Sequence, residues 1–540
     1  MPNRERYDVV IVGSGFGGAV AALRLSQAGR SVCVLERGRN FRDQDRPFPE
    51  SKVEYPKLFW TEAQDGHIDV RFYPDIAVVV GSGLGGGSLV YANVHYLPDA
   101  EMFTEGGWPA ELGDRRVLAP YYARVADMLK IRPATKDLPK IRAMEEAAHA
   151  LGKELRPVDL AVYFTDDPAQ EGVRVEDPFN RGGPWQAPCQ HIGRCNTGCN
   201  YRSKNTLDLN YLWFAEKRYS AEMATGHVVR YVEPAGDGGY LVHYTLRGGD
   251  PEDLKVVHGR TVILAAGSLG STEILLRSKH QRKTLPRVSD ALGLGFSGNA
   301  DFLAGAVGVR PDLPVDPSRG PVITRSIELK EHRFIIEDAG YPENLAGLAE
   351  LAASTVGAFP AFLRGLLSGS STALDLGNLL RDLVDMRGSE NLLPLLLMGE
   401  DAADGKIRLV EDGRLEVQWE NTRSARTFQA MEDAAATIAR HLQGTVWYSP
   451  LWLLVKRLIT VHPLGGCVLA DSPEDGVVNP KGEVFNYPGL YVADGAIVPR
   501  AVGKNPAFTI AALAERIAFW LVHKREIDPT RDPAPEAINR

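Results

Sequence analysis

The chain has 540 residues, 44% of them hydrophobic and 24% charged, which is typical of a soluble globular protein and too long for a single hydrophobic core. Its net charge of −8 and the lack of a basic run interleaved with aromatic residues argue against nucleic acid as a partner. The five cysteines do not suggest a disulfide framework. Because no apolar leader precedes the first strand and no apolar run reaches membrane-spanning length, we expect a cytoplasmic protein.

Residues 7–38 have the pattern of a dinucleotide-binding unit. An apolar β-branched run predicts a buried strand, a glycine-rich turn and a small-residue helix follow, and a second apolar strand ends on an acid. These parts are residues 9–12, Gly13-x-Gly15-x-x-Gly18, residues 19–28, residues 32–35 and Glu36. Alone, this unit predicts an adenine dinucleotide without deciding between NAD and FAD.

Each part of this unit has a physical role. Gly13 permits the tight turn, Gly15 lets backbone amides approach a pyrophosphate, and Gly18 lets helix and strand pack closely. The positive end of the helix faces the phosphates. Glu36, 18 residues beyond Gly18, is placed to accept hydrogen bonds from a ribose diol. The predicted cofactor contacts of the unit are Gly13, Gly15, Phe16, Gly17, Gly18, Glu36 and Arg37.

A second glycine cluster, GSGLGGGS at 81–88, follows an apolar strand at 76–80. The next residues show neither a helical period nor a strand ending on an acid, so we expect the cluster to wrap the same cofactor rather than a second one. Asn93 offers a donor and an acceptor to a flavin ring edge, and a simple turn residue is the alternative. The predicted contacts are Gly81, Gly86, Gly87, Ser88 and Asn93.

Two later regions complete an α/β nucleotide-binding domain. The first has a strand at 261–267 and a helix at 271–277, and the second a strand at 489–494 and a helix at 509–524. We therefore expect a discontinuous Rossmann-like domain from residues 1–95, 203–300 and 456–540, and an inserted substrate-binding domain from residues 96–202 and 301–455. Strand ends in such folds reach the cofactor, so Ala266, Gly267, Asp494 and Gly495 are further predicted contacts.

The inserted segments are unusually apolar. Residues 345–397 carry Leu, Phe and Val at roughly helical spacing. A second cluster comprises Trp447, Tyr448, Leu451, Trp452, Leu453 and Leu454. Two interpretations stay open: ordinary core packing, or a tunnel or lid for an apolar substrate with peripheral contact to a membrane surface. The Pro-rich, charged tail from Asp528 is expected to be disordered.

The C-terminal region contains the candidate catalytic residues. His462 precedes a proline, so we expect it on a strand end or turn, and imidazole is the usual group for proton exchange near neutral pH. Asn505 and Pro506 precede the last helix, where a fixed amide can orient a substrate oxygen and the positive helix end faces a flavin pyrimidine.

A metal site at Cys189, Cys195 and Cys199 with His191 is not expected, because the spacing lacks the paired C-x2-C of zinc sites. A tight loop beside the flavin is the preferred interpretation.

Together these motifs resemble the glucose–methanol–choline (GMC) oxidoreductase superfamily and, within it, the cholesterol-oxidase-like branch. The segments that carry the resemblance are GSGFGG with Glu36, GSGLGGGSLVYAN, NTGCNYRSKNTLDLNYL, AAGSLGSTEILL, FSGNADFL, HPLGGC and DGAIVPRAVGKNPAFTIAALAER. The resemblance covers nearly the whole chain. It implies an α/β fold like that of para-hydroxybenzoate hydroxylase, with the inserted domain built on a mainly antiparallel sheet with covering helices.

The resemblance also implies one non-covalent FAD and a His–Asn pair, onto which His462 and Asn505 map. The reaction would be oxidation of the CH–OH group of an apolar alcohol such as a sterol, with oxygen or another electron acceptor. The branch uses a Glu for double-bond isomerisation, and Glu337 in FIIEDAGYP is the candidate.

Three alternatives remain open. They are a dehydrogenase acting on a non-steroid alcohol, a light-driven fatty-acid decarboxylase, and a flavin-binding protein without turnover. We expect a monomer or small homo-oligomer.

Overall fold

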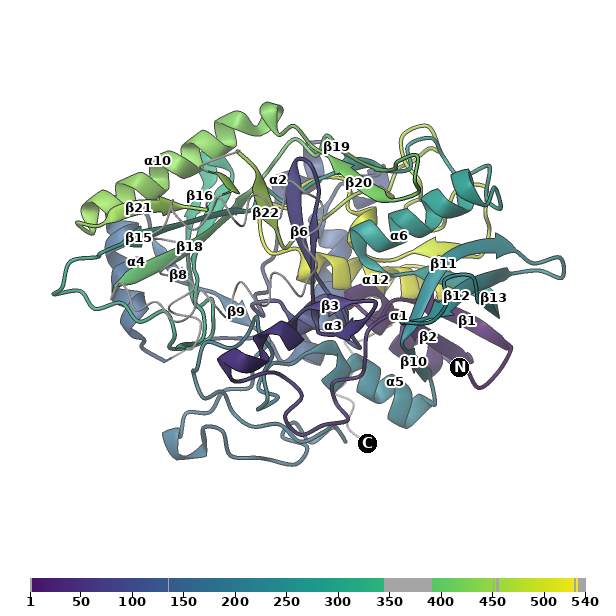
Figure 1. The fold of residues 1–540 in the computed structure, drawn as a ribbon, viewed down its shortest axis with the longest axis horizontal. Coiled ribbons are helices and arrows are strands. Elements are labelled where there is room, and N and C mark those ends of the chain that lie inside the picture. The colour runs from purple at the N-terminus through teal and green to yellow at the C-terminus, as the bar shows by residue number, and fades with distance from the viewer. Residues whose placement is uncertain are drawn as a thin grey trace.

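The computed structural model describes residues 2–134, 136–343, 391–449, 451–452, 456–528 and 531–532. These residues build two large sheets at opposite sides of the molecule, with a small sheet between them (Figure 1). The architecture is the α/β fold that the sequence predicts.

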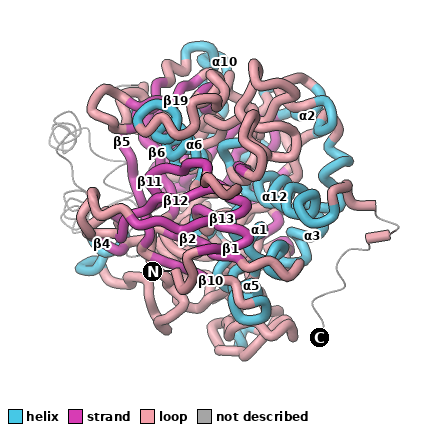
Figure 2. The backbone as a smooth tube through the Cα atoms, turned by 90° about the vertical axis from the view of Figure 1, so that its right-hand side faces the viewer, coloured by secondary structure: helices cyan, strands magenta, loops and turns pink. Residues whose placement is uncertain are grey.

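The first sheet contains the N-terminal unit. Its strands lie in the order β10 (Glu222–Thr225), β2 (Val32–Glu36), β1 (Arg6–Val12), β13 (Lys255–Leu264), β12 (Tyr240–Leu246) and β11 (His227–Pro234), and β23 (Leu490–Val492) also pairs with β13. In Figure 2, β11, β12 and β13 lie side by side, with β1, β2 and β10 beyond β13. β10, β2, β1, β13 and β23 are parallel, whereas β11 and β12 form an antiparallel extension. Most of β2 and the second half of β1 are apolar and buried, as expected for parallel strands that helices cover.

Helices from both ends of the chain cover this sheet. α1 (Phe16–Gln27) packs against α12 (Ala507–His523), α12 contacts α3 (Ala119–Leu129), and α1 also contacts α5 (Tyr211–Tyr219). α6 (Gly267–Leu276) follows β13. α1 is rich in Ala and Leu, which favour helix and permit close packing. The βαβ unit predicted at residues 7–38 is therefore confirmed in element type and order.

The second large sheet is antiparallel throughout. Its strands lie in the order β21 (Thr445–Tyr448), β15 (Phe302–Val307), β18 (Leu392–Gly399), β17 (Phe334–Asp338), β16 (Arg325–Leu329) and β8 (Leu155–Pro157). α10 (Ala425–His441) and α4 (Pro139–Ala150) cover it (Figure 1). This sheet is the predicted mainly antiparallel one with covering helices.

The predicted helical spacing of residues 345–397 is wrong where the structure describes it. Residues 392–399 form β18, a central strand whose side chains are mostly buried. A continuous apolar run suits a strand that is buried on both faces, and periodicity alone does not separate it from a buried helix. Residues 344–390 lie outside the described residues.

The aromatic cluster around Trp452 belongs to the core. Trp452 packs with ring-centroid distances of 5.2 Å to Phe302 and 5.4 Å to Phe428. Leu451 is also buried, whereas Leu453 and Leu454 lie outside the described residues, as does most of the tail after Asp528. No helix among the described residues has the length and hydropathy needed to cross a membrane.

Smaller elements connect the two sheets. The central sheet comprises β22 (Leu458–Thr460), β6 (Ile76–Gly81) and β5 (Ile68–Phe72), and another comprises β14 (Leu294–Phe296), β19 (Gly405–Leu409) and β20 (Leu415–Gln418). Two-stranded pairs are β3 (Trp60–Thr61) with β4 (Gln64–Asp65), and β7 (Arg132–Pro133) with β9 (Asp159–Leu160). Short helices are α2 (Ala100–Thr104), η1 (Lys52–Leu58), η2 (Gly86–Leu89), η3 (Ala110–Leu112), η4 (Arg115–Leu118), η5 (Pro168–Gln170), η6 (Leu207–Leu209), η8 (Lys330–His332), η10 (Thr422–Ser424), η11 (Gly495–Ile497) and the π-helix η7 (Arg277–Gln281).

The two large sheets draw their strands from the two predicted sets of segments. All seven strands of the first sheet come from residues 1–95, 203–300 and 456–540, and all six of the second from residues 96–202 and 301–455. The domain boundaries themselves stay a prediction.

Candidate active site

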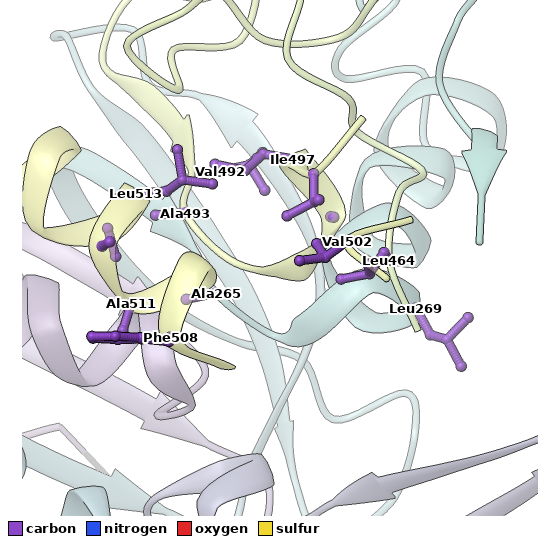
Figure 3. Packing of buried hydrophobic residues seen from close by; sticks show 14 of the residues in the cluster. Ala265, Leu269, Leu464, Val492, Ala493, Ile497, Val502, Phe508, Ala511 and Leu513 are labelled. Carbon is purple, nitrogen blue, oxygen red and sulfur yellow. The ribbon is translucent and has the colours of Figure 1, made fainter. Parts of the chain in front are cut away.

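Three loops meet at the carboxyl edge of the parallel strands. They follow β1, β13 and β23, whose parallel register brings their ends together. A Cβ on Gly13 would lie 2.4 Å from the carbonyl oxygen of Ala265, and one on Gly17 would lie 1.4 Å from that of Ala493. Figure 3 shows Ala265 and Ala493, the first residues after β13 and β23, among the buried apolar residues of this region, with Phe508 and Ala511 of α12 near Ala265. Only glycine permits this close approach.

The second glycine cluster lies directly against the first. A Cβ on Gly86, whose φ is +52°, would lie 2.7 Å from Cα of Gly15. Ser14 donates from its Oγ to Glu36 Oε2 at 2.6 Å, and the amide of Gly83 donates to Glu36 Oε1 at 3.3 Å. Glu36 therefore ties the two turns together as well as standing at the predicted ribose position. The structure brings the two clusters together at one site.

Asp494 ties the C-terminal loop to the loop after β13. Its Oδ2 accepts hydrogen bonds from the amide of Gly267 at 2.9 Å and from Ser271 Oγ at 2.5 Å, and its Oδ1 accepts one from the amide of Ala496 at 2.8 Å. Burial raises the pKa of Asp494 to about 6, although the three donors act in the opposite direction. Ala266 and Gly495 lie in the same two loops.

The other predicted cofactor contacts lie around these turns. Phe16 contacts Tyr91 edge-on at a centroid distance of 5.4 Å, and Arg37 pairs with Asp69 at 2.8 Å. Ser88 donates to the carbonyl of Gly85 at 2.7 Å. Gly18, Gly81, Gly87 and Pro506 complete the set: Gly18 packs on Gly13, Gly81 on Gly86, Gly87 near Phe16, and Pro506 is the N-cap residue of α12.

His462 follows β22, and its ring is held by a buried carboxylate. The distance from His462 Nδ1 to Asp301 Oδ1 is 2.8 Å, and the side chains are 15% and 1% exposed. A carboxylate oxygen that accepts this hydrogen bond places the proton on Nδ1, so Nε2 of the neutral ring is left as a proton acceptor. His462 thus lies beyond a strand end, as expected, in the tautomer that a general base needs.

Asn505 and Glu337 come together, although 168 positions separate them. Asn505 Nδ2 donates to Glu337 Oε2 at 3.4 Å, and both residues are buried. Within the described residues, Glu337 Oε1 and Asn505 Oδ1 have no hydrogen-bond partner. Buried polar atoms are seldom left unpaired, so these two atoms fit a bound ligand.

One turn positions both His462 and the loop that precedes Asn505. This turn, residues 297–301, includes Asp301 and also Asn299, whose Oδ1 accepts from the amides of Val502 and Gly503 at 2.9 Å each. Asn299 Nδ2 donates to the carbonyl of Lys504 at 2.9 Å. FSGNADFL contributes to the family resemblance, but we assign no role to Asn299 or Asp301 from sequence. The sequence feature that could have indicated them is the presence of two short polar side chains, Asn299 and Asp301, in a segment that also contains a glycine.

Comparisons with known proteins identify the family of this chain. The family model described as GMC oxidoreductase matches residues 402–514, and the FAD binding domain model matches residues 8–44. A cholesterol oxidase of Acinetobacter baumannii is 31% identical, with 97% of this chain and 96% of the relative covered. The chain belongs to the GMC oxidoreductases, in their cholesterol-oxidase-like branch. A cholesterol oxidase of Mycobacterium tuberculosis is 32% identical over 99% of this chain and 94% of the relative.

A solved structure shows the same fold at lower identity. Pyridoxine 4-oxidase from Mesorbium loti superposes with a TM-score of 0.65 at 18% identity, covering 96% of this chain and 99% of that one. Family and fold together confirm that the chain is an FAD-dependent oxidoreductase acting on CH–OH donors, as the sequence predicts.

The residues present in this GMC oxidoreductase fit FAD. The glycine turns leave backbone amides beside one another at a helix N-terminus, which suits a pyrophosphate. Asn93 is fully buried with φ of +70°, and within the described residues neither its Nδ2 nor its Oδ1 has a hydrogen-bond partner. A turn residue alone would not need a buried amide, so Asn93 suits a ligand with both donors and acceptors, such as a flavin edge.

The cysteine loop shows no metal cluster. Cys189, Cys195 and Cys199 are free, and among the described residues they form no group of three close metal ligands. Cys195 lies beside Lys204, which donates to its carbonyl oxygen at 2.5 Å and also to the carbonyls of Leu89 and Tyr91. Through Lys204 the cysteine loop is therefore linked to the segment that precedes Asn93.

Glu337 gives a testable pH dependence of stability. Burial raises the pKa of Glu337 well above the usual range; the hydrogen bond from Asn505 lowers it by less than burial raises it, and the nearby Asp338 and Asp301 raise it further. In the unfolded chain Glu337 ionises from about pH 4.3, whereas the folded protein retains the proton, so stability falls as pH rises above that value. This ionisation lowers the free energy of unfolding by up to about 1.4 kcal/mol per pH unit. We expect Glu337→Gln to remove that pH dependence.

The measurement is urea unfolding of both proteins between pH 5 and pH 8. The advantage of the Gln variant should grow with pH across this range. A constant difference between the two proteins would contradict a neutral Glu337.

Proposed function

We propose that this GMC oxidoreductase oxidises the hydroxyl group of a sterol. The observation that carries the proposal is that one turn holds His462 and the loop before Asn505, beside the buried Glu337. The names of the two relatives supply the substrate class. Asn505 and Glu337 are buried and His462 is largely so, which suits an apolar alcohol.

In this mechanism Nε2 of His462 accepts the hydroxyl proton while Asn505 orients the substrate oxygen. Bound FAD supplies the hydride acceptor. Asp301 keeps the His462 proton on Nδ1, so Nε2 meets the substrate unprotonated, and Asp301 then stabilises the imidazolium that forms. Oxygen is the proposed final electron acceptor, in line with the oxidases that the chain is similar to.

Glu337 has a second proposed role. The carboxyl group of Glu337, next to Asn505, is placed to take a proton from one carbon of the ketone product in its carboxylate form and to return it to another carbon as the acid, which is the isomerisation expected of the branch. Its neighbour Asp338 faces the other way into an ion pair with Lys140 at 2.8 Å, and both side chains are fully buried. This pair anchors β17 and therefore fixes where Glu337 lies.

Anaerobic titration of the purified flavoprotein tests the substrate class. We expect 3-hydroxysterols to bleach the flavin, linear long-chain alcohols to bleach it far less, and air to restore the colour. Glu337→Gln should still bleach, but its product should keep the double bond in the original position, as judged by ultraviolet absorbance. Bleaching by a non-steroid alcohol in preference to sterols, or reoxidation only by a dye, would contradict the proposal. Illumination with a fatty acid is the control for decarboxylation.

A further inference from the structure

A cluster of metal-ligand side chains lies where α4 meets α10, and it includes none of the active-site residues described above. Glu146 and His149 are three positions apart on α4, and His441 is the last residue of α10. One ligand atom from each lies within 4.8 Å of the other two. Among the described residues, these are the three His, Cys, Asp or Glu side chains that come close enough together to share a metal ion. Both helices lie on the outer side of the antiparallel sheet (Figure 1).

The orientation of the three side chains favours one shared ligand. His441 Nε2 lies 2.9 Å from Glu146 Oε2, and the rings of His149 and His441 have centroids 5.7 Å apart. Residues three apart on a helix share one face, so Glu146 and His149 both approach His441. The nearby cation Arg310 lies 3.4 Å from the other carboxylate oxygen, Glu146 Oε1, and leaves Oε2 on the side of His441.

We propose that Glu146, His149 and His441 form a zinc-binding site that fastens α4 to α10. Two imidazoles and a carboxylate are a donor set that zinc prefers, with water in the fourth position. Bond lengths of about 2.0–2.1 Å place tetrahedral ligand atoms about 3.3 Å apart. The three ligand atoms lie within 4.8 Å of one another on partly exposed side chains, so a bound ion would draw them together by at most about 1.5 Å.

The proposed role is structural. α10 packs on β15 and β21, and α4 packs on β8, β16 and β17. A metal bound by both helices would therefore link the helix that packs on β15 and β21 to the helix that packs on β8, β16 and β17. β17 is the strand that carries Glu337. The site is independent of the flavin, so its test does not depend on the proposed substrate.

Isothermal titration of the untagged, FAD-loaded protein with zinc chloride tests the proposal. We expect one saturable site per chain, a rise in Tm of about 2 °C at a hundredfold excess over Kd, and reversal by EDTA. Cobalt chloride should give the visible absorbance of a tetrahedral complex. His149→Ala and His441→Ala should each weaken zinc binding at least tenfold, with turnover in metal-free buffer unchanged.

His280→Ala is the matched control, because His280 is an exposed histidine outside the cluster. It should bind zinc as the wild type does. Equal binding by the wild type and His149→Ala, or weakening by His280→Ala to the same extent, would overturn the proposal. Circular dichroism at equal temperature separates loss of the site from loss of the fold.

Discussion

Replacing His462 with Ala is expected to lower turnover by about 10²–10⁴-fold while FAD stays bound. In the proposed mechanism the imidazole accepts the hydroxyl proton, and among the described residues His462 is the side chain that hydrogen-bonds to Asp301 Oδ1. The cofactor loops, by contrast, are held by Glu36, Asp494 and the glycine contacts, none of which involves His462. Turnover with the alcohol that bleaches the flavin and the 450 nm absorbance of the purified variant are the two measurements.

The matched control is His280→Ala, which removes an exposed imidazole from another part of the molecule. It should retain wild-type turnover. If His462→Ala kept more than a tenth of the wild-type rate, His462 would not be the base. If the variant lost its flavin, the ring would instead contribute to cofactor binding.

The sequence predicts the cofactor half of this protein better than the substrate half. Gly13, Gly15 and Gly18 have fixed spacing because a tight turn, a close backbone approach and a helix contact all depend on local geometry. Glu36 ends its strand for the same local reason. Such rules act over about thirty residues and need no knowledge of the tertiary fold.

Long-range partners are not predictable in this way. Asp301 meets His462 across 161 positions, and Glu337 meets Asn505 across 168. The pairing of β15, β18 and β17, the pairing of β22 with β6 and the position of the turn at residues 297–301 bring them together. The motif that contains Asp301 supports the family assignment without revealing that its carboxylate contacts the His462 ring. Strand β18 was missed for a related reason, since burial on both faces removes the alternation that marks a strand.

The turn at residues 297–301 combines two functions in one short segment. Asn299 and Ala300 have φ values of +55° and +45°, so the backbone is held in a left-handed conformation that hydrogen bonds must sustain. Asp401 supplies part of this support, because its Oδ2 accepts from Ser297 Oγ and the amide of Ala300 at 2.9 Å each. A change at Asp401 therefore disturbs the turn without touching His462, and provides a control for the role of Asp301.

Asp301→Asn is the second variant with a large expected effect. In the wild type, Oδ1 accepts from His462, and Oδ2 accepts from Thr460 Oγ1 and the amide of Val461 at 2.9 Å each. An amide has only one acceptor oxygen. If that oxygen faces Val461, the NH2 group donates to Nδ1 of His462 and forces the proton onto Nε2, which then cannot accept the substrate proton. If the oxygen instead faces His462, the NH2 group of the new side chain points at the N–H of Val461. Two donors then face each other and neither has its acceptor.

We expect turnover of Asp301→Asn to fall about 10²-fold or more, because a comparable carboxylate-to-amide change beside a catalytic histidine costs about 10⁴ in serine proteases through the wrong tautomer. KM and flavin content should change little. Asp401→Asn is the matched control: it should lower Tm by a similar amount but keep most of the turnover. Equal loss of turnover in the two variants would show that Asp301 only maintains the turn. A larger loss in Asp301→Asn at equal Tm would assign to its carboxylate the selection of the His462 tautomer, because the two variants weaken the same turn and only one contacts the ring.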